Sequence, residues 1–229
     1  MRKKSSFYDN KVVIKPWGYE YTIYRHLNKL SVTFLKINNN HRTSLHCHPK
    51  KKTGFIVIDG KAKIQLGLWK ETSEYYSAPS KLMIRTGLFH SIEGVSKNGV
   101  TALEFETPMD KHDLVRFKDD YGRRKKPYEG KDYSKKIGEN FIQFKKPLFG
   151  KDQFYKIGKS KIFIEVHKNF KKIINKKNST IFAILGGKII DNRGRNIISY
   201  GDIIRTGTLK KISQVFKIKE KLIVLRVSK

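Results

Sequence analysis

Residues 44–60, SLHCHPKKKTGFIVIDG, carry the strongest structural signal in the sequence. The apolar run GFIVI closes on the dipeptide DG, which is typical of a β-strand that enters a tight turn. His46 and His48 stand two positions apart. On a strand their imidazoles would therefore share one face, with Cys47 on the other. The stretch predicts a strand region in which two imidazoles converge, as they do in metal sites.

Short segments rich in β-branched and aromatic residues occupy most of the chain. They lie at 12–15, 20–25, 30–37, 54–58, 61–69, 81–86 and 100–106. Turn-forming residues separate these segments, and no long stretch has helical periodicity. Strands this short and this regularly spaced predict an all-β sandwich or barrel.

The strand pattern returns in the second half of the chain. IRTGLFHSI (84–92) is echoed by IRTGTLKKI (204–212), FIVIDGKAKI (55–64) by FAILGGKII (182–190), and SVTFLKI (31–37) by SKIFIEV (160–166). Three echoes in the same order indicate an internal duplication. We expect two tandem domains, at residues 1–108 and 153–229, joined by a charged surface linker at 109–152.

His46, His48 and His90 each lie at a strand end beside a turn. Three imidazoles with open coordination positions suit one divalent ion, and zinc, iron, manganese and nickel are all compatible. Hydrogen-bonded core or surface histidines are the alternative, but the HxH pair and its third partner favour a metal site. The second copy has other residues at these places, namely Asn175, Lys177 and Lys210. We therefore expect a metal in the first domain alone.

The histidine motifs resemble those of the cupin superfamily. HCHPKKKTGFIVIDG matches its first motif through the two histidines and Gly60, and RTGLFH matches its second through Gly87 and His90. This resemblance implies small antiparallel β-barrels of the jelly-roll type, and a duplicated chain would be a bicupin. The carboxylate ligand of the first motif falls on Thr53.

The segments KPWGYE (15–20) and KHDLVRFKDDYGR (111–123) look like the elements that flank the cupin domain of type II mannose-6-phosphate isomerases. The resemblance implies a metal-dependent, isomerase-like enzyme that acts on a sugar phosphate or a nucleotide sugar in carbohydrate or surface-polysaccharide metabolism. Two positions depart from that family. Thr53 replaces its glutamate ligand, and Ser91 replaces a basic residue next to the last histidine. These departures keep a second hypothesis open, a non-catalytic sugar-binding or regulatory cupin.

Isomerisation requires a general base, and the candidates for a catalytic role are Glu104, Glu106 and Thr53. Both glutamates alternate with Leu103 and Phe105 along one strand. Because the apolar side chains favour the core, we expect both carboxylates to face outward.

The net charge of +30 and the pI of about 10.1 favour anionic partners. Arginine is sparse and the basic runs lack interleaved aromatic residues, so a nucleic-acid-associated protein is the third and least favoured hypothesis. We expect an anionic small molecule, a sugar phosphate or nucleotide sugar, as the ligand. Lys50, Lys51 and Lys52 would suit a phosphate, but we interpret them as a solvated charge run.

One cysteine excludes an internal disulfide framework. No apolar run approaches the roughly 20 residues of a membrane span, and no apolar region follows the basic N-terminus. These features predict a cytoplasmic protein without a membrane partner, and they leave a homodimer open.

Overall fold

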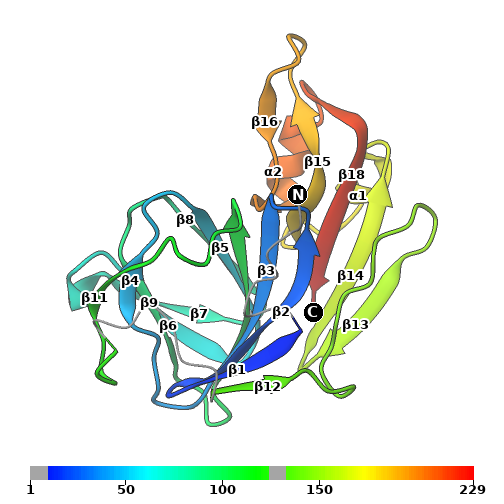
Figure 1. Cartoon of the computed structure of the whole chain (residues 1–229). Helices are drawn as coiled ribbons and strands as arrows, with labels where there is room; N and C mark the ends of the chain where they lie inside the picture. The colour runs from blue at the N-terminus through cyan, green and yellow to red at the C-terminus, as the bar shows by residue number, and fades with distance from the viewer. Residues whose placement is uncertain (1–9, 124–132) are drawn as a thin grey trace, which may run out of the picture.

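The computed structural model describes residues 10–123 and 133–229. Strands dominate these residues, and the named strands pair antiparallel. The all-β prediction is confirmed. The chain begins with a barrel of two facing sheets, the jelly-roll arrangement, which we call the first barrel (Figure 1).

The first sheet of the barrel has the order β12-β1-β2-β3-β10-β5-β8, and the second has the order β11-β4-β9-β6-β7. Their strands are β1 (Lys11–Lys15), β2 (Gly18–His26), β3 (Leu30–Ile37), β4 (Leu45–Cys47), β5 (Lys52–Asp59), β6 (Lys61–Leu66), β7 (Ser73–Ser77), β8 (Ser80–Ile84), β9 (His90–Gly94), β10 (Val100–Thr107), β11 (Val115–Lys118) and β12 (Ser134–Lys136). A short 3-10 helix, η1 (Lys70–Thr72), precedes β7. Trp17, Leu35, Phe55, Ile64 and Ile92 fill the space between the two sheets.

The second unit consists of one sheet and two short helices. Its elements are β13 (Gln153–Ile157), β14 (Ser160–His167), α1 (Lys171–Ile174), β15 (Ile181–Ile190), β16 (Asn196–Ile198), β17 (Ile203–Arg205), α2 (Thr206–Ile212) and β18 (Lys217–Ser228). The sheet order is β13-β14-β18-β15-β16, and β17 also pairs with β15. Leu209 of α2 and Ile173 of α1 pack with Phe182 and Val224 on one face of this sheet. In the part of the chain that the structure describes, these helices stand where a closed barrel has a second sheet.

The three sequence echoes fall in strands at equivalent places. The order β3-β10-β5-β8 in the first barrel corresponds to β14-β18-β15-β17 in the second unit. The histidine-bearing strands β4 and β9 correspond to the regions of α1 and α2, because Asn175 caps α1 and Lys210 lies in α2. The second unit thus repeats one sheet of the first barrel and has helices instead of the strands that carry the histidines.

One echo is shifted by a single residue. The strand pairing can be followed across each sheet from the matched residues Phe55 and Phe182. It makes Thr33 structurally equivalent to Phe163, whereas the sequence echo aligns Thr33 with Ile162. Since neighbouring residues of a strand point to opposite faces, the sequence echo alone would place each residue of β14 on the wrong face.

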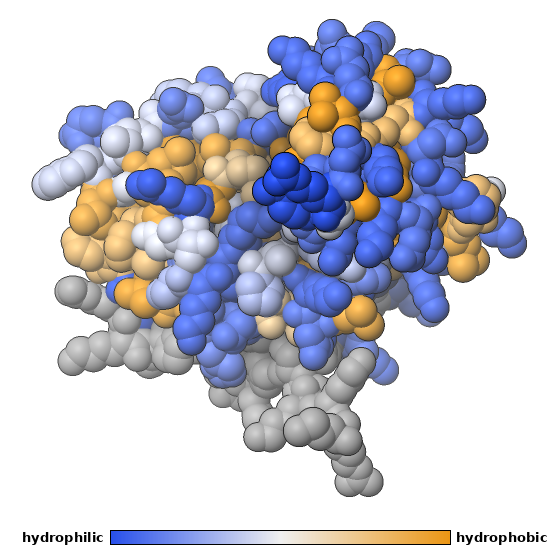
Figure 2. All heavy atoms as spheres, turned by 90° about the horizontal axis from the view of Figure 1, so that it is seen from above, coloured by the Kyte–Doolittle hydropathy of each residue, from blue (hydrophilic) through white to orange (hydrophobic). Residues whose placement is uncertain are grey.

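The two units share a core. The outer face of the first sheet packs against the sheet of the second unit through Leu103, Phe105, Ile164 and Leu225, all almost fully buried. On the side where the second unit lies, most of the surface is hydrophilic when seen from above (Figure 2). No helix among the described residues is both long and apolar enough to cross a membrane.

The segment predicted as a surface linker, 109–152, is partly integrated into the first barrel. Its strand β11 pairs with β4, and its strand β12 pairs with β1. Phe144 is buried in the core between the units. Residues 124–132 of the predicted linker lie outside the described residues.

Candidate metal centre

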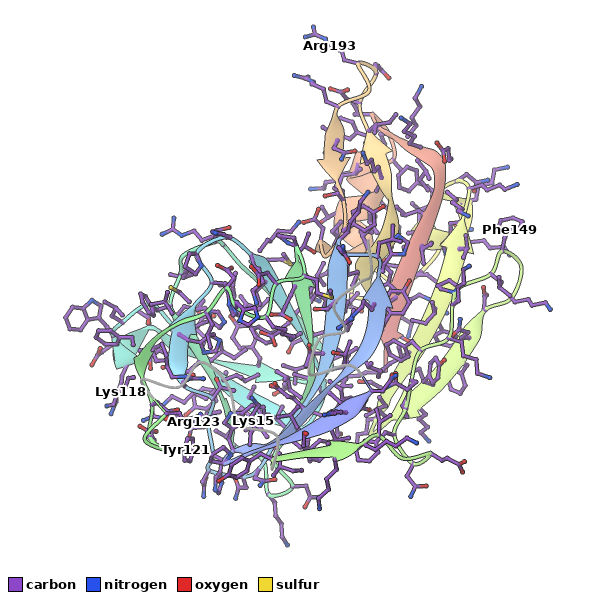
Figure 3. The ribbon with its side chains drawn as sticks, viewed as in Figure 1. Lys15, Lys118, Tyr121, Arg123, Phe149 and Arg193 are labelled. Carbon is purple, nitrogen blue, oxygen red and sulfur yellow. The ribbon has the colours of Figure 1, made fainter. Side chains whose placement is uncertain are left out.

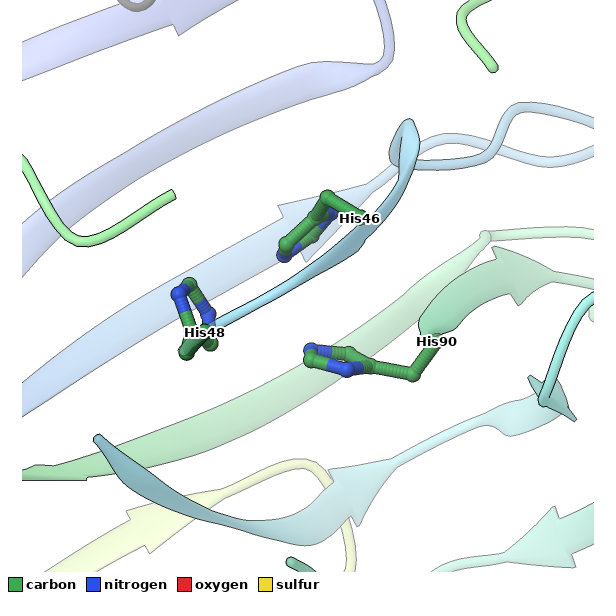
Figure 4. A group of neighbouring side chains, drawn as sticks. All are labelled: His46, His48 and His90. Carbon is green, nitrogen blue, oxygen red and sulfur yellow. The ribbon is translucent and has the colours of Figure 1, made fainter. Parts of the chain in front are cut away.

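The fold brings the three predicted histidines together. His46 lies on β4 directly opposite His90 on β9, and His48 follows the end of β4. Their rings converge on one point inside the first barrel (Figure 4), with centroids 4.6 Å apart for His46 and His90, 5.1 Å for His46 and His48, and 5.4 Å for His48 and His90. One potential ligand atom from each histidine lies within 4.8 Å of those of the other two.

Each imidazole is oriented by a backbone carbonyl. Nδ1 of His46 lies 2.7 Å from the Ser44 oxygen, Nδ1 of His48 lies 2.6 Å from the Asp113 oxygen, and Nδ1 of His90 lies 3.0 Å from the Leu88 oxygen. A carbonyl only accepts, so Nδ1 carries the proton and Nε2 keeps its lone pair in a neutral ring. Nε2 of His48 and Nε2 of His90 are buried without a hydrogen-bond partner. Metal-ligating histidines have this arrangement, in which the second ring nitrogen donates to a carbonyl or carboxylate.

Burial keeps the three rings neutral. Desolvation lowers the pKa of His90 to about 3, and it lowers the pKa of His46 and of His48 below the usual value of histidine. Neighbouring histidines and Lys51 act in the same direction because a second positive charge opposes protonation. Three neutral imidazoles with free lone pairs are chemically suited to a divalent ion.

Glu104 and Glu106 face the histidines, so the expectation that both carboxylates point outward is wrong. Both line the same cavity as His48. Leu103 and Phe105 do occupy a core, but it is the core shared with the second unit on the outer face of β10. Both faces of β10 are therefore buried, and its alternation alone does not reveal which side is the barrel interior.

Glu106 is held by three donors. Its carboxylate accepts from Lys51 Nζ at 2.5 Å, Lys111 Nζ at 2.6 Å and Ser31 Oγ at 3.0 Å. The two ammonium groups hold the pKa of Glu106 well below its usual range, against the effect of burial. In the described residues we find no hydrogen bond to the carboxylate of Glu104, and burial together with Glu106 raises its pKa to about 8.

Thr53 is buried on the inner face of β5. It pairs with Glu106 of β10 on one side and with Ile84 of β8 on the other. Its Oγ1 is buried without a hydrogen-bond partner. The position assigned to a carboxylate ligand from the motif thus holds a small neutral side chain, and Glu106 stands across the strand from it.

Asp113 supports the loop that follows the histidines. Besides accepting from His48, it receives the backbone N–H of Lys50 at 3.0 Å and that of Lys51 at 2.8 Å on its carboxylate. It lies in the KHDLVRF stretch that sequence reasoning had matched to a flanking element without giving it a role. Asp113 therefore fixes the positions of the His48 imidazole and of the backbone of Lys50 and Lys51.

Lys51 is not part of a solvated charge run. It is 2% exposed and lines the cavity with the histidines, while Lys50 is exposed and Lys52 pairs with Asp202 of the second unit at 2.7 Å. Lysine is rarely buried to this degree without a partner, and here the partner is Glu106. No local sequence signal distinguishes Lys51, because the three consecutive lysines look alike.

The site cavity has a volume of about 80 Å³, and its lining includes further cations. Arg116 donates to Ser44 Oγ at 3.0 Å, Lys15 pairs with Glu20 at 3.3 Å, and Arg123 pairs with Asp119 at 2.6 Å. Figure 3 labels Lys15 and Arg123 on the first barrel. The arrangement can hold a metal ion beside carboxylates and can receive an anionic group.

Comparison with known proteins gives a family match over the first barrel. The family model described as mannose-6-phosphate isomerase C-terminal matches residues 2–119. No curated protein matches the chain.

Several solved structures are similar to part of the chain. One is the capsular polysaccharide assembling protein CapF from Staphylococcus aureus, with 17% identity over 47% of this chain and 34% of that one and a TM-score of 0.42. Another is KdgF from Halomonas sp., with 12% identity over 42% and 85% and a TM-score of 0.38. The chain thus spans about a third of the length of CapF.

Proposed function

The chain belongs to the mannose-6-phosphate isomerase C-terminal family, and from this premise we propose that its first barrel binds one divalent metal ion through His46, His48 and His90. We further propose that the site acts on an anionic sugar, either a sugar phosphate or a nucleotide sugar. Zinc, iron(II), manganese and nickel are all candidates for the ion.

One observation carries the metal assignment. All three rings direct Nδ1 to a backbone carbonyl, and two of the Nε2 atoms are buried without a partner. A buried nitrogen lone pair without a hydrogen bond costs free energy unless something outside the chain satisfies it. A shared divalent ion would satisfy the Nε2 atoms of His48 and His90 and would also bind the third imidazole, His46.

Glu104 and Glu106 differ in how well they suit the role of general base. A divalent ion bound here would polarise a carbonyl or hydroxyl oxygen of the substrate. In an aldose–ketose isomerisation, Glu104 would take the proton from one carbon and return it to the neighbouring carbon. Glu106 is less suited to this step because two ammonium groups and a hydroxyl already occupy it.

His48→Ala tests the metal assignment. We expect the purified protein to carry metal and the variant to lose it on dialysis, because one of three ligands is gone. Elemental analysis of both proteins measures this. His41→Ala is the matched control, since His41 contacts the Asn39 carbonyl outside the site. A His48→Ala protein with the full metal content would contradict the assignment.

Thr53 favours a second candidate function, a binding protein without catalysis. The family's glutamate ligand is absent there, which is how a decayed site would look. Thr53→Glu separates the two candidates. In an active, anion-binding site the new carboxylate should tighten metal binding and weaken an anionic ligand, because both anions compete for one position. Calorimetric titration with zinc and then with mannose 6-phosphate measures both effects. Tighter zinc binding without any ligand effect would favour the decayed site.

A further inference from the structure

Lys51 places a positive charge beside the three histidines. Its ammonium group donates to Glu106, and ligand atoms of Glu106 and His48 lie within 4.8 Å of each other. An ammonium group this near would repel a divalent ion, and the low dielectric of a buried site strengthens the repulsion.

The anionic groups of the site do not offset this charge in full. Glu106 is shared by Lys51 and Lys111, so one carboxylate faces two ammonium groups. Glu104 and Glu20 also line the cavity, but its three carboxylates still face five cationic side chains, namely Lys15, Lys51, Lys111, Arg116 and Arg123. The hydroxyl of Thr53 is buried without a partner next to Glu106. The cavity lined by His46, His48 and Lys51 therefore offers a polar position next to both kinds of side chain.

We propose that this position is an oxyanion seat shared by the metal ion and Lys51, so that metal and anionic ligand bind cooperatively. The proposal rests on the proposed metal site. A phosphate or carboxylate oxygen placed there would face the metal on one side and the ammonium group on the other. The anion screens the repulsion between the metal ion and Lys51, and the metal ion adds to the attraction for the anion. Each of the two therefore raises the affinity of the protein for the other by the same factor.

The role of Lys51 differs from that of a structural ion pair. A lysine that only stabilised Glu106 would affect folding and leave the ratio of metal affinities with and without anion unchanged. Lys51 as part of the seat predicts that this ratio depends on its charge. Lys52 gives the matched comparison, because its ion pair with Asp202 lies between the units and it does not line the cavity.

The experiment is calorimetric titration with zinc, in chloride and in sulfate at equal ionic strength, and then with mannose 6-phosphate. We expect sulfate or mannose 6-phosphate to raise the zinc affinity of the unmodified protein and of Lys52→Met about fivefold or more. Lys51→Met should bind zinc more tightly in chloride and gain almost nothing from either anion. Lys51→Gln, which can still donate a hydrogen bond to Glu106, replaces Lys51→Met if that variant does not fold.

The outcomes separate the two proposals. Zinc binding that is lost in His48→Ala but does not respond to anions would overturn the shared seat and leave the metal site standing. Undiminished coupling in the Lys51 variants would also overturn it. Coupling that appears only in Glu104→Gln would show that Glu104 itself fills the fourth position, and it would overturn the shared seat in the unmodified protein. Absence of any zinc binding at the histidines would overturn both proposals.

Discussion

Glu104→Gln is expected to lower the rate of proton transfer by about 10²- to 10⁴-fold, the usual contribution of a positioned general base. Glutamine cannot take up the proton that moves between neighbouring carbons. It does preserve the size and shape of the glutamate side chain, whose pKa burial and Glu106 raise to about 8. The variant should therefore fold normally and keep its metal.

Mannose 6-phosphate in deuterium oxide is the assay, with exchange at the carbon next to the carbonyl and formation of fructose 6-phosphate both followed by NMR. Glu20→Gln is the control, because Glu20 lines the same cavity but is paired with Lys15. We expect the control to stay within a few-fold of the unmodified protein, because Lys15 already pairs with the Glu20 carboxylate and makes it a poor base. Equal activity of Glu104→Gln and the unmodified protein would remove Glu104 from the mechanism, and Glu106 would replace it as the candidate.

Local patterns were sufficient to predict that the three histidines come together. His46 and His48 share a strand face because of their spacing, and His90 lies opposite His46 because β4 and β9 pair. The spacing and the repeat position were both visible in the sequence. The Nδ1 partners were not, since Ser44, Leu88 and Asp113 act through backbone carbonyls, which any residue type provides.

The orientation of the carboxylates required tertiary information. Alternation correctly separates Glu104 and Glu106 from Leu103 and Phe105, but it does not tell which face is the barrel interior. The assignment failed because a second sheet covers the outside of β10. The burial of Lys51 was equally hidden, because it depends on Glu106, which is 55 residues away in the sequence.

The duplication was visible in the sequence as three echoes, but the structure of the second copy was only partly predictable. Strand order is kept from β3-β10-β5-β8 to β14-β18-β15-β17. The segment TGTLKKI forms a helix in the second unit, because Leu209 and Ile212 lie three residues apart and pack together against the sheet. The similar segment TGLFHSI of the first copy leads into a strand. Identical residues at the start of both segments did not distinguish these structures.

Phe105→Ala is expected to destabilise the protein by about 3–5 kcal/mol, the usual cost of truncating a buried phenylalanine. Phe105 is fully buried in the core between the first barrel and the second unit. Phe154→Ala is the control, because Phe154 is 56% exposed at the sheet edge and its loss should cost no more than about 0.5 kcal/mol. Urea unfolding followed by tryptophan fluorescence measures both, with Trp17 as a buried reporter in the first barrel.

This comparison also tests why the second unit is present. If the first barrel were an independent domain with a solvated outer face, Phe105→Ala and Phe154→Ala would have similar midpoints. A large loss for Phe105 alone means that the second unit stabilises β10 from outside. The same strand presents Glu104 and Glu106 to the histidines on its inner face. The apolar outer face of β10 is buried by the second unit, so the second unit would hold in place the strand that presents both glutamates to the histidines.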